Sequence, residues 1–185
     1  MTPIVTLLPQ LRVLAAIRQL STTRPAVVLI DGGSGSGKST LADAVHNEWP
    51  GSQLVRLENI YPGWDGLEAA SAQLQHFVLE PFAHGLPARW REWDWAADAP
   101  AGWHPVDSAA PLLIEGSGAL SRANRALAHL GIWVECAAGA GERYRRAMAR
   151  DDEQHAAHWE RWDRQETAFA VREHPSEIAD LIVVT

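Results

Sequence analysis

The sequence has few of the residues that mark secreted or nucleic-acid-binding proteins. A single cysteine, Cys136, has no partner for an internal disulfide, and nothing in the composition points to an oxidising compartment. Basic residues are outnumbered by acidic ones, 16 to 23, so the formal net charge of -7 argues against a nucleic-acid partner or an anionic membrane surface. Any site for phosphate groups must therefore be built locally, from a few well-placed donors.

Long apolar runs are also missing. The first twenty residues are rather apolar, but Pro9, Arg12 and Arg18 interrupt them, and they lack the basic start and small-residue cleavage site of a secretory signal. No other run approaches the roughly 20 apolar residues that a membrane helix needs. We therefore expect a cytoplasmic protein with no membrane partner. Its 185 residues, 46% apolar and 21% charged, have the size and balance of a single globular domain over 1–185.

What the chain does contain is an alternation of short apolar runs and longer helical patterns. Such alternation predicts an α/β fold with a parallel sheet whose strands are covered on both faces. The expected strands are 26–31, 54–58, 112–115, 132–135 and 181–185. The expected helices are 9–20, 38–49, 67–83, 119–130 and a lid-like helical region over about 141–172.

The segment over about 85–111 fits neither pattern. It holds four of the chain's nine tryptophans and four of its eleven prolines. Loops of this length inside a compact domain are usually functional or disordered. Because the tryptophans argue against disorder, we expect an ordered but irregular insertion over the sheet.

One motif carries the strongest functional signal. It matches G-x-x-x-x-G-K-[ST] directly after an expected strand and at the start of an expected helix, as a phosphate-binding loop (P-loop) requires. Its residues are Gly32, Gly33, Ser34, Gly35, Ser36, Gly37, Lys38, Ser39 and Thr40. The glycines allow backbone N–H groups to surround phosphates, and the lysine adds a point charge for the β- and γ-phosphates. The hydroxyl of Ser39 is expected to bind Mg²⁺, so the predicted cofactors are ATP and Mg²⁺.

The segment 30–41 resembles the opening of the uridine kinase branch of P-loop kinases, near phosphoribulokinase and bacterial pantothenate kinase. The chain also resembles small bacterial ATP-binding proteins with a Y-P-G-W-D-G motif, which is found here at 61–66. This resemblance implies a three-layer P-loop NTPase fold with a five-stranded parallel sheet in the order 2-3-1-4-5. It also implies transfer of the ATP γ-phosphoryl group to a small molecule, with a uridine- or cytidine-like nucleoside favoured.

Two acidic residues match the carboxylates of this pattern. Glu58 lies where the uridine kinase branch has the aspartate of Asp-x-Phe-Tyr, so the resemblance makes it the base for the acceptor hydroxyl and a neighbour of the metal. It is longer than aspartate by one methylene, and a structural role at the end of a strand is the alternative. Glu115 follows an apolar strand and is expected at the sheet edge beside the P-loop, where it can hold Mg²⁺. The alternative is a strand-end glutamate without a metal.

A basic segment at 143–150 is close to the lid helix of the same branch. Arg143, Arg146 and Arg150 are three or four residues apart and share one helical face, which suits the charge of a triphosphate. The alternative is a solvated helix paired with Glu142, Asp151 and Asp152.

The acceptor side is less specific. Aromatic faces can stack on a planar base, and carboxylates can accept hydrogen bonds from sugar hydroxyls. The candidate substrate-binding residues are Tyr61, Trp64, Asp65, Trp93 and Asp94. Packing in the core or lid is an equally good reading of the tryptophans.

A small-molecule kinase is therefore the leading hypothesis. A nucleotide-binding regulatory protein without turnover is the first alternative, because Glu58 replaces the aspartate of the resembling kinases. An ATP hydrolase is the second. Oligomerisation is left open.

Overall fold

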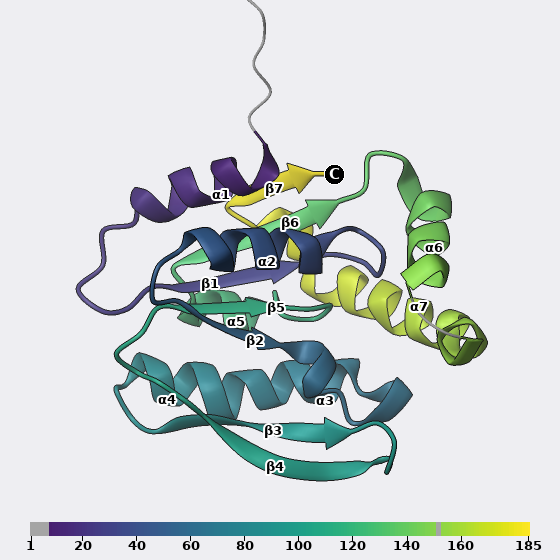
Figure 1. The fold of residues 1–185 in the computed structure, drawn as a ribbon, viewed down its shortest axis with the longest axis horizontal. Helices are drawn as coiled ribbons and strands as arrows, with labels where there is room; N and C mark the ends of the chain where they lie inside the picture. The colour runs from purple at the N-terminus through teal and green to yellow at the C-terminus, as the bar shows by residue number, and fades with distance from the viewer. Residues whose placement is uncertain (1–7, 151–152) are drawn as a thin grey trace, which may run out of the picture.

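The computed structural model describes residues 8–150 and 153–185, without the side chains of residues 150 and 153–155. A parallel sheet of five strands forms the centre (Figure 1). In spatial order its strands are β2 (Gln53–Arg56), β5 (Leu112–Glu115), β1 (Val27–Asp31), β6 (Leu130–Glu135) and β7 (Leu181–Val184). When these five strands are numbered among themselves along the chain, the order is 2-3-1-4-5. The predicted sheet is confirmed.

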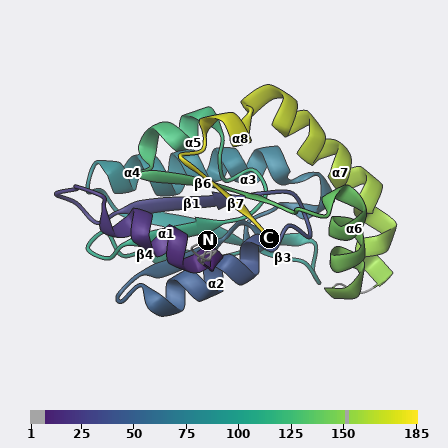
Figure 2. The same ribbon diagram turned by 90° about the horizontal axis from the view of Figure 1, so that it is seen from above.

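Helices cover both faces of the sheet (Figure 2). The helices α1 (Pro9–Arg18) and α2 (Lys38–Glu48) lie on one face, where Val28 and Ile30 of β1 join their apolar side chains in one core cluster. Val27 and Leu29 point to the other face and join a second cluster. β1 is thus buried at all five positions, because each face of a central parallel strand needs an apolar side chain.

The second face is covered by other helical segments. A continuous run spans the predicted helix 67–83, with a π-helical middle that the sequence did not indicate. Its parts are α3 (Leu67–Gln73), η3 (Leu74–Leu79) and α4 (Glu80–Ala83). The others are α5 (Arg122–Leu127), α7 (Glu153–Glu173) and α8 (Pro175–Ile178).

Two helix predictions are corrected. The segment 119–130 is helical only in α5, because Ser121 caps its N-terminus by accepting a 3.1 Å hydrogen bond from the Asn124 backbone N–H. The loop before it needs Gly118 at φ 88°. The region 141–172 contains α6 (Gly139–Arg150) and α7, which run in different directions (Figure 1).

The prediction of an irregular insertion over the sheet is wrong. The segment 85–111 contains an antiparallel hairpin of β3 (Ala88–Asp94) and β4 (Ala99–Val106), which packs against η3 at the β2 side of the molecule (Figure 1). Pro100 and Pro105 lie within β4. A two-stranded sheet leaves one edge of each strand unpaired, so it tolerates residues without an N–H donor that would disrupt a central strand.

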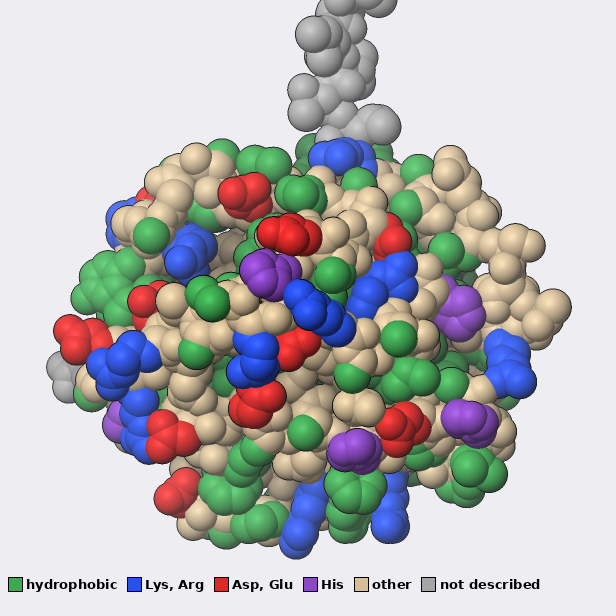
Figure 3. All heavy atoms as spheres, turned by 180° about the vertical axis from the view of Figure 1, so that it is seen from behind, with side chains coloured by type: hydrophobic (Ala, Val, Ile, Leu, Met, Phe, Trp, Pro, Cys, Tyr) green, Lys and Arg blue, Asp and Glu red, His purple; other side chains and the backbone are tan. Residues whose placement is uncertain are grey.

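The surface shows no separation of charge by sign on the face seen in Figure 3, where acidic, basic and histidine side chains are interspersed with apolar ones. Within the described ranges 8–150 and 153–185, no helix combines the length and apolar character needed to cross a bilayer.

Candidate nucleotide-binding site

The P-loop connects the carboxyl end of β1 to the first turn of α2. Gly35 and Gly37 have φ values of 74° and 89°, a left-handed backbone that glycine adopts without strain. Gly37 immediately precedes α2, and no side chain that the structure describes caps the N–H groups of this helix end. Those unpaired donors and the positive end of the helix dipole form the expected binding site for phosphate groups.

Lys38 is buried, with 9% of its surface exposed, at the start of α2. Its ammonium group makes no hydrogen bond or ion pair with any residue that the structure describes. Asp31, just before the loop, accepts hydrogen bonds from the backbone N–H groups of Gly32, Gly118 and Leu120. Burial raises the pKa of Asp31 to about 7, although these hydrogen bonds and the nearby lysine oppose the shift. Asp31 therefore anchors the base of the loop and leaves Lys38 free for a ligand.

Ser39 and Glu115 come together beside Lys38. The Oγ atom of Ser39 lies 3.3 Å from Oε2 of Glu115, and Nη1 of Arg56 lies 3.4 Å from the other carboxylate oxygen. Two oxygen ligands on adjacent corners of an octahedron around Mg²⁺, each about 2.1 Å from the ion, are about 3 Å apart. The 3.3 Å between Ser39 Oγ and Glu115 Oε2 is close to this value, so the two groups are placed to bind Mg²⁺ directly or through water.

The Glu115 carboxylate is buried at the end of β5, and burial raises its pKa. A cation at this position would favour the ionised form. Among the residues described, no three His, Cys, Asp or Glu side chains gather as a metal cluster. A Mg²⁺ site of the phosphate-bridging kind needs only one or two carboxylates, because phosphate oxygens and water supply the remaining ligands.

Glu58 lies beyond the end of its strand. The expected strand 54–58 stops at Arg56, and Glu58 falls in the short 3₁₀ helix η1 (Leu57–Asn59). Its side chain is exposed, and its charge acts on both Glu115 and Tyr61. Its carbonyl oxygen accepts a 3.0 Å hydrogen bond from the indole of Trp95, which ties the hairpin to η1. The carboxylate is thus exposed near the proposed metal ligands.

Two of the three predicted lid arginines lie at the P-loop. Arg143 donates a 3.2 Å hydrogen bond to the Ser34 carbonyl oxygen, and its guanidinium covers Gly33 so closely that a Cβ there would lie 2.1 Å from Nη1. Arg146 pairs with Glu142 at 2.9 Å and reaches Thr185 Oγ1 at 3.4 Å. The pairing with Glu142 agrees in part with the alternative interpretation, in which these arginines pair with acidic side chains on a solvated helix. The side chain of Arg150 lies outside the described residues.

Glu166, a residue of α7 that the sequence pattern did not indicate, binds the P-loop from the other side. Its carboxylate accepts hydrogen bonds from the Ser34 N–H and hydroxyl at 2.9 and 2.8 Å, and from the Ser117 hydroxyl at 2.7 Å. The indole of Trp162 donates a further bond at 3.0 Å, and Arg143 lies 3.7 Å away. Glu166 therefore holds α7, and through Arg143 also α6, against the loop. No motif surrounds it, and 132 residues separate it from Ser34.

Of the predicted substrate-binding residues, Trp93 lines a cavity. This cavity has a volume of about 260 Å³ between the hairpin and the helical run, and Phe77 and Trp103 also line it. The indole N–H of Trp93 is buried without a hydrogen-bond partner among the described residues. Ile60, two residues after Glu58, forms part of the wall. An acceptor molecule bound there would lie close to η1.

The other four predicted substrate residues have structural contacts. Tyr61 is buried and donates a 2.8 Å hydrogen bond to the Ser117 carbonyl oxygen, so it packs inside the core instead of facing a ligand. Asp94 accepts hydrogen bonds from the backbone N–H groups of residues 96 and 97, which fixes the turn of the hairpin. Asp65 is exposed and pairs with an arginine of α7. Trp64 is half-buried and stacks on His158, with ring centroids 4.5 Å apart.

Comparison with known proteins is consistent with this geometry. A protein-family model described as Zeta toxin matches residues 12–89, fewer than half of the 185. No curated protein matches the chain. A structure described as a possible uridine kinase from Bacillus stearothermophilus has a TM-score of 0.68 at 15% identity, over 95% of this chain and 97% of that one. A structure described as a candidate fructose transport system kinase from Silicibacter sp. TM1040 has a TM-score of 0.56 at 20% identity, over 96% and 99%.

The chain has a kinase-like P-loop fold. At these identities the similarity concerns the fold and leaves the substrate open. In this kinase-like fold Lys38, Ser39 and Glu115 lie together at the carboxyl ends of the parallel strands. This is the edge where open α/β sheets bind ligands. The helices α6 and α7 stand at the same edge (Figure 1).

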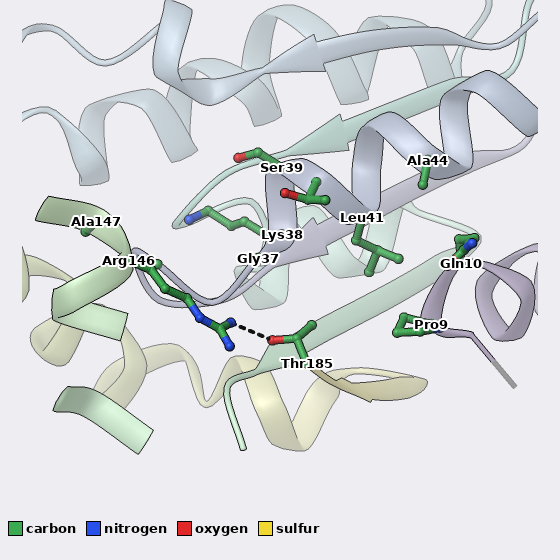
Figure 4. Close-up of a pocket in the computed structure, with 12 residues that line it drawn as sticks. Pro9, Gln10, Gly37, Lys38, Ser39, Leu41, Ala44, Arg146, Ala147 and Thr185 are labelled. Carbon is green, nitrogen blue, oxygen red and sulfur yellow. Dashed lines mark hydrogen bonds between the residues drawn. The ribbon is translucent and has the colours of Figure 1, made fainter. Parts of the chain in front are cut away.

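A second and larger cavity extends from this edge along α2 (Figure 4). Its volume is about 440 Å³, within the range of ligand pockets. Lys38 and Arg146 lie at one end, and Thr185 lies between them and α1. Thr185 donates a 2.7 Å hydrogen bond to the Ser36 carbonyl oxygen, so the end of β7 supports the P-loop. Ser36 Oγ is itself buried without a partner in the part of the chain that is described.

Proposed function

We propose that this protein is an ATP-dependent phosphotransferase that transfers the γ-phosphoryl group to a hydroxyl of a small molecule. The observation that carries the proposal is the 3.3 Å pairing of Ser39 with the buried Glu115, next to an unpaired Lys38. A buried carboxylate with a raised pKa and a buried, unpaired lysine are both costly without a ligand. Mg²⁺ with a triphosphate would satisfy both groups together.

Each residue has a role in the transfer. Lys38 and the loop N–H groups hold the β- and γ-phosphates. Ser39 and Glu115 would hold Mg²⁺, which would offset the phosphate charge. The acceptor oxygen forms a bond to the γ-phosphorus as the bond to the β,γ-bridging oxygen breaks, and ADP leaves with that electron pair. Glu58 accepts the hydroxyl proton. Arg143 and Arg146 stabilise charge on the transferred group, so catalysis is mainly positioning and electrostatics.

The acceptor is proposed to bind in the cavity under the hairpin. The rings of Phe77, Trp93 and Trp103 offer apolar faces, and the unpartnered Trp93 N–H offers one hydrogen bond. These features favour a planar ring with an acceptor atom at its edge, such as the base of a uridine- or cytidine-like nucleoside. The names of the two similar structures, a possible uridine kinase and a candidate fructose transport system kinase, agree with a hydroxyl acceptor. We also propose, from the Y-P-G-W-D-G motif, that the chain belongs to the small bacterial ATP-binding proteins that share this motif.

The test is acceptor-dependent release of ADP. The purified protein is incubated with Mg-ATP and a panel of nucleosides, pantothenate-like alcohols, sugars and sugar phosphates, with Lys38→Ala as the inactive control. A kinase releases ADP only when an acceptor is present. Release of inorganic phosphate without any acceptor would instead identify an ATP hydrolase. Mg-ATP binding with no turnover across the panel would favour the regulatory alternative.

Lys38 provides a separate test of nucleotide binding. It is the only lysine in the 185-residue chain, so an amine-reactive reagent modifies one side chain, which mass spectrometry distinguishes from the N-terminal amine. Mg-ATP should protect Lys38 from modification. Equal labelling with and without Mg-ATP would contradict the proposed site.

A further inference from the structure

The 440 Å³ cavity has two chemically different ends. Lys38, Ser39 and Arg146 form the end at the P-loop. Pro9, Gln10 and Ala44 form the opposite end, where α1 meets α2 (Figure 4). The positive groups are therefore confined to one end, while the other end combines apolar walls with a single carboxamide.

The spacing of these ends suits a nucleotide. Lys38 and Ala44 are six residues apart on α2, which corresponds to about 9 Å along the helix axis. A nucleotide whose β-phosphate lies at Lys38 extends its α-phosphate and ribose over this length. Its base then reaches the end formed by α1.

The walls at that end match a base. Pro9, Leu41 and Ala44 offer apolar surface for the flat faces of a ring. The carboxamide of Gln10 forms no hydrogen bond with any residue in the ranges 8–150 and 153–185, so its donor and its acceptor are both available. A glutamine amide can form two hydrogen bonds with adenine, accepting from the N6 amine and donating to N7. Guanine presents two acceptors at the same edge, so only one of those bonds can form.

We propose that α1 forms the base subsite of this pocket and that Gln10 selects adenine over guanine. The inference rests on the proposed binding of a nucleoside triphosphate at the P-loop. It assigns a specificity role to a helix that precedes the P-loop strand.

The experiment measures affinities for ATP, GTP and inorganic tripolyphosphate, each with Mg²⁺, by calorimetry. Tripolyphosphate carries the phosphate contacts without a base. Wild-type protein should bind ATP more tightly than GTP. Gln10→Met keeps the length and apolar stem of the side chain and removes both hydrogen-bonding groups, so ATP should bind about 10-fold more weakly, GTP should weaken less than ATP, and tripolyphosphate should not change.

Two further variants separate the base subsite from a general effect on the fold. Gln19→Met makes the same chemical change at the exposed far end of α1, and it should leave all three affinities unchanged. Ala44→Leu fills the proposed base position, so it should weaken both nucleotides but not tripolyphosphate. Melting curves without ligand show whether each variant is folded.

The outcomes distinguish the inference from the proposed function. If wild-type protein binds ATP and Gln10→Met keeps the same ATP-to-GTP ratio, the role of Gln10 is refuted while nucleotide binding stands. If Ala44→Leu weakens tripolyphosphate as much as ATP, the base does not bind at the α1 end. If wild-type protein binds neither nucleotide, the inference and the proposed function both fail.

Discussion

Replacement of Glu115 by glutamine should have opposite effects on the free protein and on its Mg-ATP complex. In the free protein, burial raises the pKa of Glu115, so its contribution to stability decreases as the pH rises from the ordinary pKa of a glutamate through the raised one. Glutamine keeps the shape and removes this cost. The substitution also removes the 3.4 Å ion pair with Arg56. This should cost little stability, because that arginine is partly exposed and also pairs with Asp43. The melting temperature without ligand should therefore stay the same or rise.

With Mg-ATP the same substitution should reduce stabilisation. Loss of a group at or next to a metal typically weakens metal binding 10- to 100-fold. A ligand at a hundredfold its dissociation constant stabilises the wild type by about 2.7 kcal/mol, and this falls to about 1.4 kcal/mol for a 10-fold loss or about 0.4 kcal/mol for a 100-fold loss. At about 2–4 °C per kcal/mol for a chain of this size, the shift in melting temperature falls from about 5–11 °C to about 3–6 °C or about 1–2 °C.

The assay is thermal unfolding with Mg-ATP, with ATP plus EDTA, and without ligand. Glu135→Gln is the matched control, because Glu135 ends another strand of the same sheet, β6, and is exposed. It should leave all three melting temperatures nearly unchanged. If Glu115→Gln lowers the ATP shift equally with and without Mg²⁺, Glu115 is not at the metal. If it destabilises the free protein strongly, the carboxylate has a structural role that the raised pKa does not describe.

Three further predictions concern other parts of the site. Glu58→Gln should leave ATP affinity nearly unchanged and lower acceptor-dependent kcat by 10²- to 10⁴-fold, with Glu58→Asp partly active; full turnover in the glutamine variant would exclude Glu58 as the base. Trp93→Phe keeps the ring and loses the N–H, so the KM for the acceptor should rise about 5-fold with kcat unchanged, whereas an unchanged KM would place the acceptor elsewhere. Asp31 has its pKa raised to about 7, so its contribution to stability should decrease as the pH rises from about 4 through 7, by at most about 1.4 kcal/mol per pH unit. The melting temperature of Asp31→Asn should therefore fall less than that of the wild type between pH 5 and 8. If the melting temperatures of the two proteins change in parallel with pH, Asp31 does not ionise at a cost to stability in this range.

The parts of the site that sequence predicted are short and contiguous. The segment from Gly32 to Thr40 determines its own conformation, because its glycines allow a left-handed turn and its placement between strand and helix exposes the backbone donors. Apolar runs predicted the five central strands, because a strand covered on both faces needs apolar residues at every position. Glu115 could be placed at the sheet edge for the same reason, since parallel strands end together.

Expectations from residue type differ from the structure where tertiary contacts override local preferences. Prolines in 85–111 argued against strands, yet a hairpin with free edges accepts them. Tyr61 and Asp94 are residue types that can bind a substrate, but a carbonyl oxygen and a turn already use their polar groups. Such competition between internal and external partners is invisible until the neighbours are known.

The sequence by itself determined the P-loop and the five central strands, since these depend on local propensity and apolar periodicity, and its resemblance to P-loop kinases implied the strand order. Only the tertiary structure brought Glu166 to Ser34 across 132 residues and placed Gln10 at the same cavity as Ala44. Contacts of this kind depend on how helices pack over both faces of the sheet, and the geometry of that packing is set by the whole core. The phosphate end of the site is therefore encoded locally, while the proposed base and acceptor ends exist only in the folded chain.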